Sequence, residues 1–355
     1  MSKSKTANPM EAVAAYTPVD DDFKLKDNAS AIAIDENYAA QSFWKDVFIR
    51  YFRKASAVIG LFLIVLITVM AVIGPDMNEY TYSGQNLDQK NFAPRIKVLE
   101  KFGIFNGDEK MNTTTGTKTI NYYKEFGLDD VEYWFGSDKF GRDIWTRTWS
   151  GARVSLIIAV AAAVIDMVIG MSYGLISGYF GGKTDMIMQR ILEIANGIPR
   201  LVIVTLLLLI LEPGMLTIIF ALMLTEWVGM SRIARAEMLK LKEQEFVLAS
   251  RTLGAGHFFI IFKEVLPNII GPIITQVMFS IPTAIFTEAF LSFVGLGIPV
   301  PQCSLGSLIS EGFNSFTTHP YQIVPPIVVM ALLMLSFNLV ADGLREALDP
   351  KMKEM

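Results

Sequence analysis

Long apolar segments separated by charged ones are the main pattern in this chain of 355 residues. The first apolar segment runs from Ala55 to about Ile73 and ends at Gly74-Pro75. A helix of about 20 apolar residues is long enough to cross the hydrocarbon core of a membrane. Further segments of this kind follow at about Val154–Ile176, Ile194–Leu211, Met215–Ile233, Ile269–Phe293 and Ile323–Val340. The pattern predicts an all-α polytopic membrane protein with six transmembrane helices, the first of them over residues 55–74.

The residues before the first apolar segment predict the side of the membrane on which the chain starts. Residues 42–54 mix aromatic residues with Lys and Arg, which is typical of an amphipathic segment at the cytoplasmic interface. Residues 1–41 contain an acidic run, Asp20-Asp21-Asp22, and lack the compact apolar core of a signal peptide. We therefore expect a disordered cytoplasmic tail over 1–41, an interfacial segment over 42–54 and a cytoplasmic C-terminus.

Residues 75–150, between the first and second apolar segments, are too polar to lie in a membrane. They carry charges throughout and a polar run from Met111 to Thr117. Long loops are translocated largely regardless of their Lys and Arg content, so these basic residues do not oppose an outside location. We expect a large extracytoplasmic insertion here, with strands around Lys118 to Tyr123.

Small residues recur at a spacing of four along the second apolar segment. They are Gly151, Ser155, Ala159, Ala163, Gly170, Gly174 and Gly178. Small residues on one face of a membrane helix let a neighbouring backbone approach closely. This helix is therefore predicted to pack at the centre of a bundle.

Three carboxylates fall inside apolar segments, where an unpaired charge is costly. Asp166 is interpreted either as a polar group on a translocation path or as a hydrogen-bond partner between helices. Glu226 is a further candidate for such a path. Glu288 either forms part of an outer gate, bonded to a partner or to its own outer loop, or reaches the aqueous interface from a helix end.

Composition excludes several other classes of function. The chain is 52% hydrophobic and 19% charged with a formal net charge of −4, and it has no basic stripe for a nucleic-acid partner. A single cysteine, Cys303, excludes an internal disulfide and a multi-cysteine metal site. Only two histidines are present; we expect His257 to be a solvated loop residue and His319 a turn residue.

Nucleotide binding by this chain is not expected. Gly181 to Thr184 reads Gly-Gly-Lys-Thr, like the end of a P-loop, but Ser177 stands where the motif needs its first glycine. An apolar helix, instead of a strand, precedes this stretch. If ATP drives this protein, another polypeptide must bind it.

The loop over residues 240–268 separates the fourth and fifth apolar segments and begins with charges at Lys240, Lys242 and Glu243. Each charge at mid-membrane costs about 2.5–3.5 kcal/mol, so the loop lies at a membrane surface. The basic residues before it place that surface in the cytoplasm. No Gly or Pro occurs from Glu245 to Leu253, which predicts a short interfacial helix, and Gly254 can stop it in the left-handed conformation.

This loop resembles the EAA loop of ABC-transporter membrane subunits. Leu248-Ala249-Ser250 stands for the triplet, Gly254 for the glycine and Leu266-Pro267 for the closing pair, while Glu245-Phe246 fits the variant of peptide and nickel importers. The sequence departs from the pattern at Leu248, Ser250 and Glu264. The resemblance implies an ATPase-docking loop formed by Glu245, Phe246, Ala249, Ser250, Arg251, Leu253, Gly254, Ala255 and Pro267.

Three further stretches resemble the second permease subunit of oligopeptide, dipeptide and nickel importers. They are Phe135–Asp143 with Gly151–Leu156, then Glu288–Gly297, and last Phe337–Pro350. Together they imply a permease core over residues 151–350. Two departures are Ser304-Leu305-Gly306, where the family often has Ser-Trp-Gly, and a region from about Tyr80 to Tyr133 that is longer than usual.

The resemblance implies a bacterial plasma-membrane permease that imports oligopeptides and itself holds no catalytic residue, cofactor or metal. It implies as partners a second homologous permease, two ABC ATPase subunits that bind ATP and Mg²⁺, an extracytoplasmic peptide-binding protein and the lipid bilayer. Dipeptide or nickel import is the alternative within this class. An ion-gradient-driven secondary transporter is the alternative from another class; the membrane carboxylates favour it, but no inverted repeat is evident. A purely structural membrane scaffold is a third possibility.

Overall fold

The computed structural model describes residues 43–113 and 116–348, so the tail expected over 1–41 lies outside the described residues. The chain divides into two units, Met1–Asp46 and Val47–Met355. The described part of the first unit is the start of helix α2 (Phe43–Arg53). All other described elements belong to the second unit.

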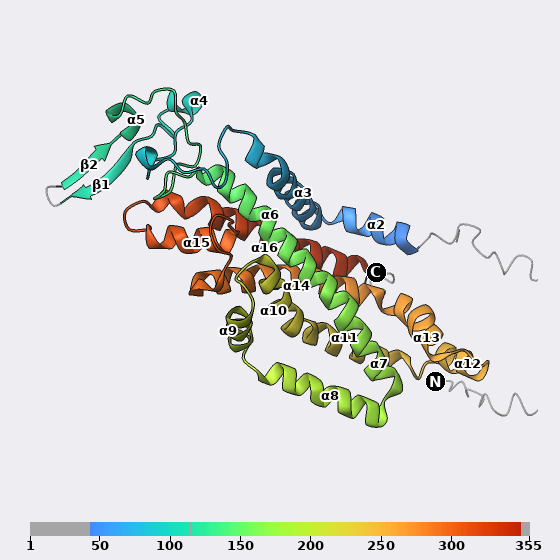
Figure 1. Ribbon diagram of the computed structural model, residues 1–355. Coiled ribbons are helices and arrows are strands. Elements are labelled where there is room, and N and C mark those ends of the chain that lie inside the picture. The colour runs from blue at the N-terminus through green and yellow to red at the C-terminus, as the bar shows by residue number, and fades with distance from the viewer. Residues whose placement is uncertain (1–42, 114–115, 349–355) are drawn as a thin grey trace, which may run out of the picture. The chain divides into compact units, whose positions relative to one another are not determined.

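Five helical runs are long and apolar enough to cross a membrane (Figure 1). They are Ala55–Asp76, Ile144–Phe180, Met215–Leu241, His257–Leu296 and Pro320–Leu348. Each contains an apolar segment predicted from the sequence. The remaining prediction, one span over Ile194–Leu211, is not met by a single straight helix: Gly182–Gly197 and Leu201–Ile210 are bent by 80° at the break between them.

Several of the runs are built from shorter helices joined end to end. The elements of the helical part are α3 (Ala55–Ile73), η2 (Gly74–Asp76), α6 (Ile144–Ile165), η4 (Asp166–Gly170), α7 (Met171–Phe180), α8 (Gly182–Gly197), α9 (Arg200–Ile210), α10 (Met215–Thr225), α11 (Trp227–Leu241), α12 (Glu245–Thr252), α13 (His257–Phe259), η5 (Ile260–Val265), α14 (Leu266–Leu291), η6 (Ser292–Leu296), α15 (Leu305–Asn314), η7 (Pro320–Gln322) and α16 (Val324–Leu348). The segments η4, η5 and η6 are π-helical.

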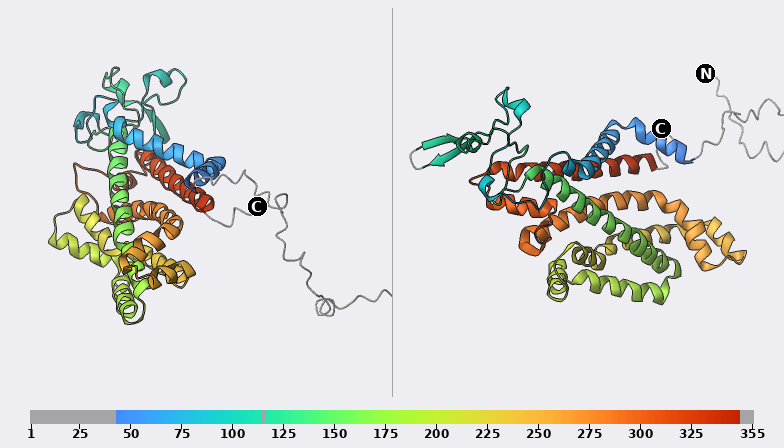
Figure 2. Two further views of the ribbon diagram at one scale, coloured as in Figure 1. Left: turned by 90° about the vertical axis from the view of Figure 1, so that its right-hand side faces the viewer. Right: turned by 45° about the horizontal axis from the view of Figure 1, so that its top comes forward.

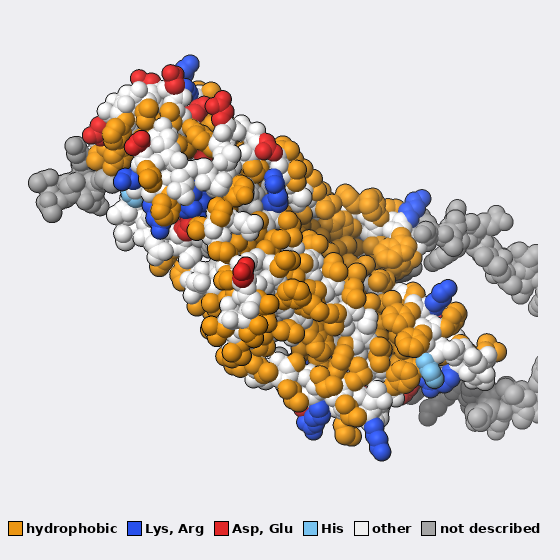
Figure 3. Space-filling model, in the orientation of Figure 1, with side chains coloured by type: hydrophobic (Ala, Val, Ile, Leu, Met, Phe, Trp, Pro, Cys, Tyr) orange, Lys and Arg blue, Asp and Glu red, His pale blue; other side chains and the backbone are white. Residues whose placement is uncertain are grey.

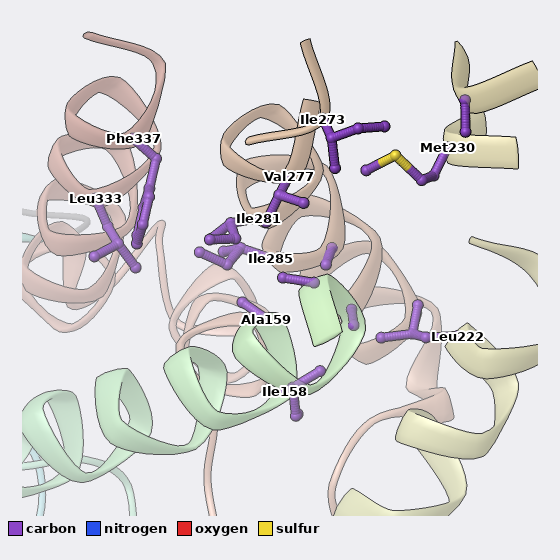
Figure 4. Packing of buried hydrophobic residues seen from close by; sticks show 14 of the residues in the cluster. Ile158, Ala159, Leu222, Met230, Ile273, Val277, Ile281, Ile285, Leu333 and Phe337 are labelled. Carbon is purple, nitrogen blue, oxygen red and sulfur yellow. The ribbon is translucent and has the colours of Figure 1, made fainter. Parts of the chain in front are cut away.

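Helix α14 lies at the centre of the core and packs against α6, α11 and α16. Figure 4 shows its buried side chains meeting those of α6, α10, α11 and α16. On α14, Ile281 lies on the side of Leu333 of α16, and Ile273 lies on the side of Met230 of α11. Helix α3 packs along α16, as both views of Figure 2 show, while its own Ile59, Phe62 and Val69 stay exposed. An exposed apolar face of this kind suits a helix that borders lipid.

The small-residue stripe packs as predicted, and α7 lies against α11. A Cβ atom on Gly174 would come within 2.1 Å of the Ser231 carbonyl oxygen, so only glycine allows the two backbones this approach. In the same helical run Ser155, Ala159 and Ala163 are buried. The prediction that this helix is central to the bundle is confirmed.

Residues 77–143 form a separate folded segment between η2 and α6. It contains η3 (Leu87–Gln89), α4 (Lys97–Glu100), β1 (Glu109–Thr113), β2 (Gly116–Ile120) and α5 (Tyr122–Glu125). The two strands pair antiparallel, with Glu109 opposite Ile120. Phe92, Tyr123 and Tyr133 form its own small core. The strand expected around Lys118 to Tyr123 therefore ends at Ile120, because Tyr122 already begins a helix.

Helix α6 begins at Ile144, ahead of the predicted boundary of the core at residue 151. On the face drawn in Figure 3, charged side chains gather over the folded segment 77–143 at one end. Others gather at the opposite end, near α8 and α12, and apolar side chains cover most of the surface between them. This distribution suits a bundle that crosses a membrane with a polar part at each end.

Candidate functional site

Helix α12 confirms the short helix predicted to start at Glu245, and its end shows why Gly254 is needed. Gly254 has a φ of +85°, a conformation that glycine adopts without strain. Its N–H donates to the Arg251 carbonyl at 3.0 Å, and the Ala255 N–H donates to the Ser250 carbonyl at 3.1 Å. This pair of bonds is a Schellman motif, which satisfies the last carbonyls of the helix and turns the chain sharply.

One side of α12 is anchored and the other is open. Val247 is fully buried, with 0% of its surface exposed. Phe246, Leu248 and Leu253 instead leave large apolar areas exposed, and Leu253 is 88% exposed. Apolar side chains presented together outside the core commonly mark a protein–protein contact.

Both ends of the segment that carries α12 are fastened to the end of α7; we call residues 242–257 the coupling segment. Before α12, Lys242 Nζ donates to the Gly178 carbonyl at 3.3 Å. After it, His257 Nδ1 lies 3.0 Å from the Tyr179 hydroxyl. Arg251 of α12 places its guanidinium 5.5 Å from the centre of the Tyr179 ring. His257 is exposed, as expected, but it begins helix α13 instead of lying in a loop, and the sequence did not reveal its bond to Tyr179.

Charged groups also hold α7, α8 and α11 together near the coupling segment. Asp185 of α8 accepts from Arg235 Nε at 2.6 Å and from Arg235 Nη2 at 2.5 Å. Its carboxylate also accepts from the Ser177 hydroxyl of α7. A bidentate pair of this kind fixes the orientation of both side chains. The coupling segment is therefore fastened to α7, which is itself tied to α8 and α11.

Pro267 is separated from the other predicted docking residues. It occupies the first turn of α14, directly after the π-helical segment η5. Proline has no N–H to donate, so it fits the first turn of a helix. The structure thus groups Glu245 to Ala255 in one helix and turn and leaves Pro267 on the helix that follows. Their role in docking stays a prediction.

Glu288 is fully buried, which rules out the interpretation that it reaches the aqueous interface. Its Oε1 accepts hydrogen bonds from Ser304 Oγ at 2.6 Å and from Ser292 Oγ at 2.7 Å. Its Oε2 accepts from Ser155 Oγ at 3.1 Å. The carboxylate therefore joins α14, α6 and the outer loop, and agrees with the interpretation that it bonds to its own outer loop.

The other two membrane carboxylates lie on different elements. Asp166 is 3% exposed and opens the π-helical segment η4, which packs against α11. Glu226 is half-buried at the junction of α10 and α11. The burial of Asp166 against a neighbouring helix favours the interhelical interpretation over an open path. A path role for Glu226 stays a prediction.

A buried group of charges lies where α6 begins, and we call it the outer clasp: Asp138, Arg142, Arg147 and Glu311. The Arg142 and Arg147 side chains are 2% and 1% exposed. Arg142 donates to Asp138 at 2.6 Å and to Glu311 at 2.7 Å, and Arg147 donates to Glu311 at 3.1 Å. The clasp therefore fastens segment 77–143 and α6 to helix α15 in the outer loop.

Asp143 and His319 make further contacts at this junction. Asp143 caps α6 by accepting from the Thr146 N–H at 2.8 Å and from Asn78 at 2.8 Å. Burial raises the pKa of the Asp143 carboxyl, and these hydrogen bonds oppose that rise. His319, expected only as a turn residue, is buried and lies 2.8 Å from Glu109 of β1.

The motif around the outer clasp was recognisable in the sequence, but the clasp itself was not. Asp138 and Arg142 stand four residues apart in the Phe135–Asp143 stretch. This spacing of an acidic and a basic residue was the sequence signal for the clasp. Glu311 gave no signal of its own, and Ser304 and Ser155, although they lie in stretches named from the sequence, gave no signal of a bond to Glu288. They become partners only because the fold brings the outer loop against the start of α6.

Two hollows follow one face of α14 and share Phe279. The larger has a volume of about 510 Å³ and the smaller about 320 Å³. Polar side chains line both, including Gln276 in the larger, and Thr283 and Asn338 in the smaller. Glu237, Lys240 and Arg345 lie at the larger hollow. None of the carboxylates predicted on a path lines either hollow.

Comparison with known families identifies the class of protein to which this arrangement belongs. A model of the binding-protein-dependent transport system inner membrane component matches residues 170–354, more than half of the chain. The chain belongs to this family. Residues 42–94 also match a model of the N-terminal transmembrane domain of oligopeptide transport permease C. The resemblance inferred from the sequence is confirmed.

Individual permeases are similar in sequence to this chain over most of their length. The oligopeptide transport system permease protein OppC of Bacillus subtilis is 42% identical over 88% of this chain and 91% of that protein. The dipeptide permease DppC of Bacillus subtilis is 40% identical over 88% of this chain and 87% of that protein. DppC of Lactococcus lactis is 42% identical, with coverage of 89% and 92%. This permease is thus a multi-pass membrane component of a transport system and not a catalytic enzyme.

Proposed function

We propose that this permease is one of two membrane subunits of an ATP-driven importer of peptides. The observation that carries the proposal is the coupling segment: a helix ended by a Schellman turn, anchored by Val247 and fastened at both ends to α7. Such a segment moves as one body with the bundle. Its exposed Phe246 and Leu253 offer a surface on which an ATPase subunit docks.

The proposed assembly contains a second homologous permease, two ATPase subunits that bind ATP and Mg²⁺, and an extracytoplasmic peptide-binding protein. The bent pair α8 and α9 serves as the sixth span, and segment 77–143 lies outside the cell. Both chain ends and the coupling segment lie in the cytoplasm of a bacterial cell. The basic residues before α3 and after α10 support this orientation.

The α14 face with the two hollows is this subunit's side of the path. Peptide main chains carry unsatisfied amide groups, which need hydrogen-bonding partners when they leave water. Gln276, Thr283 and Asn338 supply such groups along the hollows. ATP binding closes the ATPases and moves the coupling segments, so the path opens outward to receive peptide. It reopens inward after hydrolysis. No bond of the substrate breaks, so this chain needs no catalytic residue.

Oligopeptides and dipeptides are both substrates of similar relatives, at 42% and 40% identity in Bacillus subtilis. We favour oligopeptides, because the hollows together extend along several turns of α14, from Gly271 to Phe286. Dipeptide import is the second candidate. Uptake of a labelled dipeptide in competition with a labelled pentapeptide decides between them.

The test of the main proposal is purification of this permease from its native membrane, followed by reconstitution in liposomes. Co-purification of ATPase subunits is the expected result, together with uptake of peptide supplied outside the vesicles with its binding protein, and this uptake should require ATP inside the vesicles. Uptake by this chain alone, driven by an ion gradient, would instead identify a secondary transporter. Nickel uptake in place of peptide uptake would correct the substrate and leave the transporter class intact.

A further inference from the structure

A small basic hollow lies between the end of α2 and the end of α16. Its volume is about 140 Å³, and it is lined by Arg50, Arg53, Lys54, Gly343, Glu346 and Ala347. Three cations against one carboxylate leave a formal charge of +2 in the lining. A hollow with this charge attracts an anion.

Tight packing builds the frame of the hollow. Tyr51 of α2 donates its hydroxyl to the Ala57 carbonyl at 3.1 Å. A Cβ atom on Gly343 would lie 2.3 Å from the Ala57 Cβ, so α16 approaches α3 closely at this point. Val47, Tyr51 and Ala347 are buried together in one apolar cluster. The basic side chains therefore project from a rigid support.

The charged side chains that line the hollow differ in their partners and exposure. Lys54 Nζ is 2.5 Å from the Glu346 carboxylate, so this pair largely balances its own charge. Arg50, which is half-buried, and Arg53, which is exposed, also line the hollow. Guanidinium groups bind phosphate oxygens in a bidentate manner, so two arginines beside one hollow suit a phosphate group.

Large apolar side chains are also exposed on the same helix. Phe48, Ile49 and Phe52 are 64%, 38% and 45% exposed. A helix with Arg on one side and large apolar side chains on another typically lies in the membrane interface. Helix α3 follows directly and is one of the runs long enough to cross a membrane. The hollow is thus placed at the level of lipid headgroups.

We propose that this hollow binds the phosphate group of an anionic phospholipid, with Arg50 and Arg53 as its ligands. The acyl chains of that lipid lie beside Phe48, Ile49 and Phe52. The phosphate chemistry is shared with soluble phosphate, but the exposed apolar side chains next to the hollow favour the lipid. Basic hollows beside membrane helices commonly bind anionic headgroups. The hollow shares no lining residue with the two hollows on α14 or with the coupling segment.

The test uses the complete purified transporter, stripped of lipid in detergent, and native mass spectrometry. Short-chain phosphatidylglycerol, short-chain phosphatidylcholine and inorganic phosphate are titrated separately. Wild type should bind phosphatidylglycerol at least about tenfold more tightly than phosphatidylcholine, and inorganic phosphate more weakly than either lipid. The double variant Arg50→Gln with Arg53→Gln should lose the preference for phosphatidylglycerol.

The matched control removes two arginines elsewhere, Arg190→Gln with Arg232→Gln, and should keep the preference. If the double variant fails to assemble, Arg53→Gln alone is used, because its exposed side chain does not support the packing. Equal binding of the two lipids by wild type, or an unchanged preference in the variant, would overturn the proposal. Inorganic phosphate that binds as tightly as phosphatidylglycerol would overturn the assignment to a lipid.

Discussion

Glu288 of α14 accepts a 2.6 Å hydrogen bond from Ser304, the residue that caps α15 in the outer loop. Ser292 donates to the same carboxylate oxygen at 2.7 Å, but from the next turn of its own helical run. One bond thus joins two elements, and the other stays within one. Removing each serine in turn therefore tests whether the bond between two elements or the bond within one helical run matters for function.

Ser304→Ala should lower the thermal stability of the purified complex and alter basal ATP hydrolysis or transport. It removes both the bond to Glu288 and the cap of α15, and a lost hydrogen bond to a charged group costs about 1.5–3 kcal/mol. Ser292→Ala, the control, should have a smaller effect on transport. Equal effects of the two variants would mean that the connection between α14 and the outer loop is unimportant.

Glu288→Gln extends this prediction to the carboxylate. The amide keeps one acceptor oxygen and turns an N–H₂ group toward serine hydroxyls that donate to both carboxylate oxygens. Expression should persist, while basal ATPase activity or uptake changes. If expression, ATPase activity and uptake of the variant all match the wild type, Glu288 is not part of the gate.

Glu311→Gln should destabilise the protein strongly. Arg142 and Arg147, whose side chains are 2% and 1% exposed, would then share Asp138 as their remaining carboxylate in the outer clasp. Breaking a buried ion pair costs about 3–5 kcal/mol, because a charge stays buried without compensation. The readout is the thermal unfolding of the purified complex.

The control for the outer clasp is Glu193→Gln, which breaks an ion pair with Arg190 on α8. Those two side chains are 59% and 73% exposed, so water replaces the lost partner. Exposed pairs contribute about 0–1 kcal/mol. A Glu311→Gln variant no less stable than this control would show that the clasp does not hold the outer loop.

Much of the fold could be predicted because it depends on local pattern. The length of α3 follows from an apolar run, the packing of α7 on α11 from glycines at a spacing of four, and the end of α12 from Gly254. The 80° bend between α8 and α9 was missed although Gly197 and Pro199 lie within the predicted span. These residues disfavour a continuous helix, but apolar content outweighed them in the prediction.

The candidate site was predictable only in part, for a physical reason. The coupling segment is continuous in sequence, so its helix and turn could be inferred. The outer clasp joins Arg142 to Glu311, which are 169 residues apart, and neither residue indicates its partner. The hollows along α14 were also missed, because they depend on which faces α11 and α16 leave uncovered.

Tyr179→Phe should partly uncouple ATP hydrolysis from uptake. The phenyl ring keeps the contact with Arg251 but loses the 3.0 Å bond to His257, so one fastening of the coupling segment is released. Tyr179→Ala loses both contacts and should uncouple further. The measurement is the ratio of peptide imported to ATP hydrolysed in liposomes. Tyr173→Phe, in which the lost bond goes to the Met188 carbonyl of α8, is the control.

A ratio that stays at the wild-type value in Tyr179→Ala would contradict the idea that α7 moves with the coupling segment. A ratio that falls equally in Tyr173→Phe and Tyr179→Phe would point to general loosening of α7. Val247 would then be the main anchor of α12.

Gly254→Ala should also reduce coupling while leaving membrane insertion intact. No atom would lie within 4 Å of the new Cβ, so the cost comes from the positive φ alone. That cost is about 1–2 kcal/mol for a residue with a side chain. Gly256→Ala is a close control, because Gly256 has equal space but a φ of −69°. Pro or Trp at position 254 should have larger effects than Ala. Normal coupling in Gly254→Pro would show that the Schellman turn is dispensable.

The last prediction concerns which side of the membrane each polar part occupies. Burial raises the pKa of the Cys303 thiol to about 11, and the thiol donates to the Arg147 carbonyl. The reactive thiolate is therefore scarce at neutral pH, and Cys303 should not react with an impermeant maleimide while the protein is folded. Cys303→Ser provides a background without thiols.

In that background, Phe102→Cys and Leu253→Cys serve as probes, because these side chains are 76% and 88% exposed. Phe102 lies in the segment proposed to be outside, and Leu253 lies in the coupling segment proposed to be in the cytoplasm. Intact spheroplasts should label the cysteine at position 102, and position 253 should label only after permeabilisation and removal of the ATPase subunits proposed to dock there. The opposite pattern would invert the proposed orientation and exclude an ATPase from the coupling segment. Labelling of both positions in intact spheroplasts would show that they share one side, and would contradict the proposal that the bent pair α8 and α9 crosses the membrane.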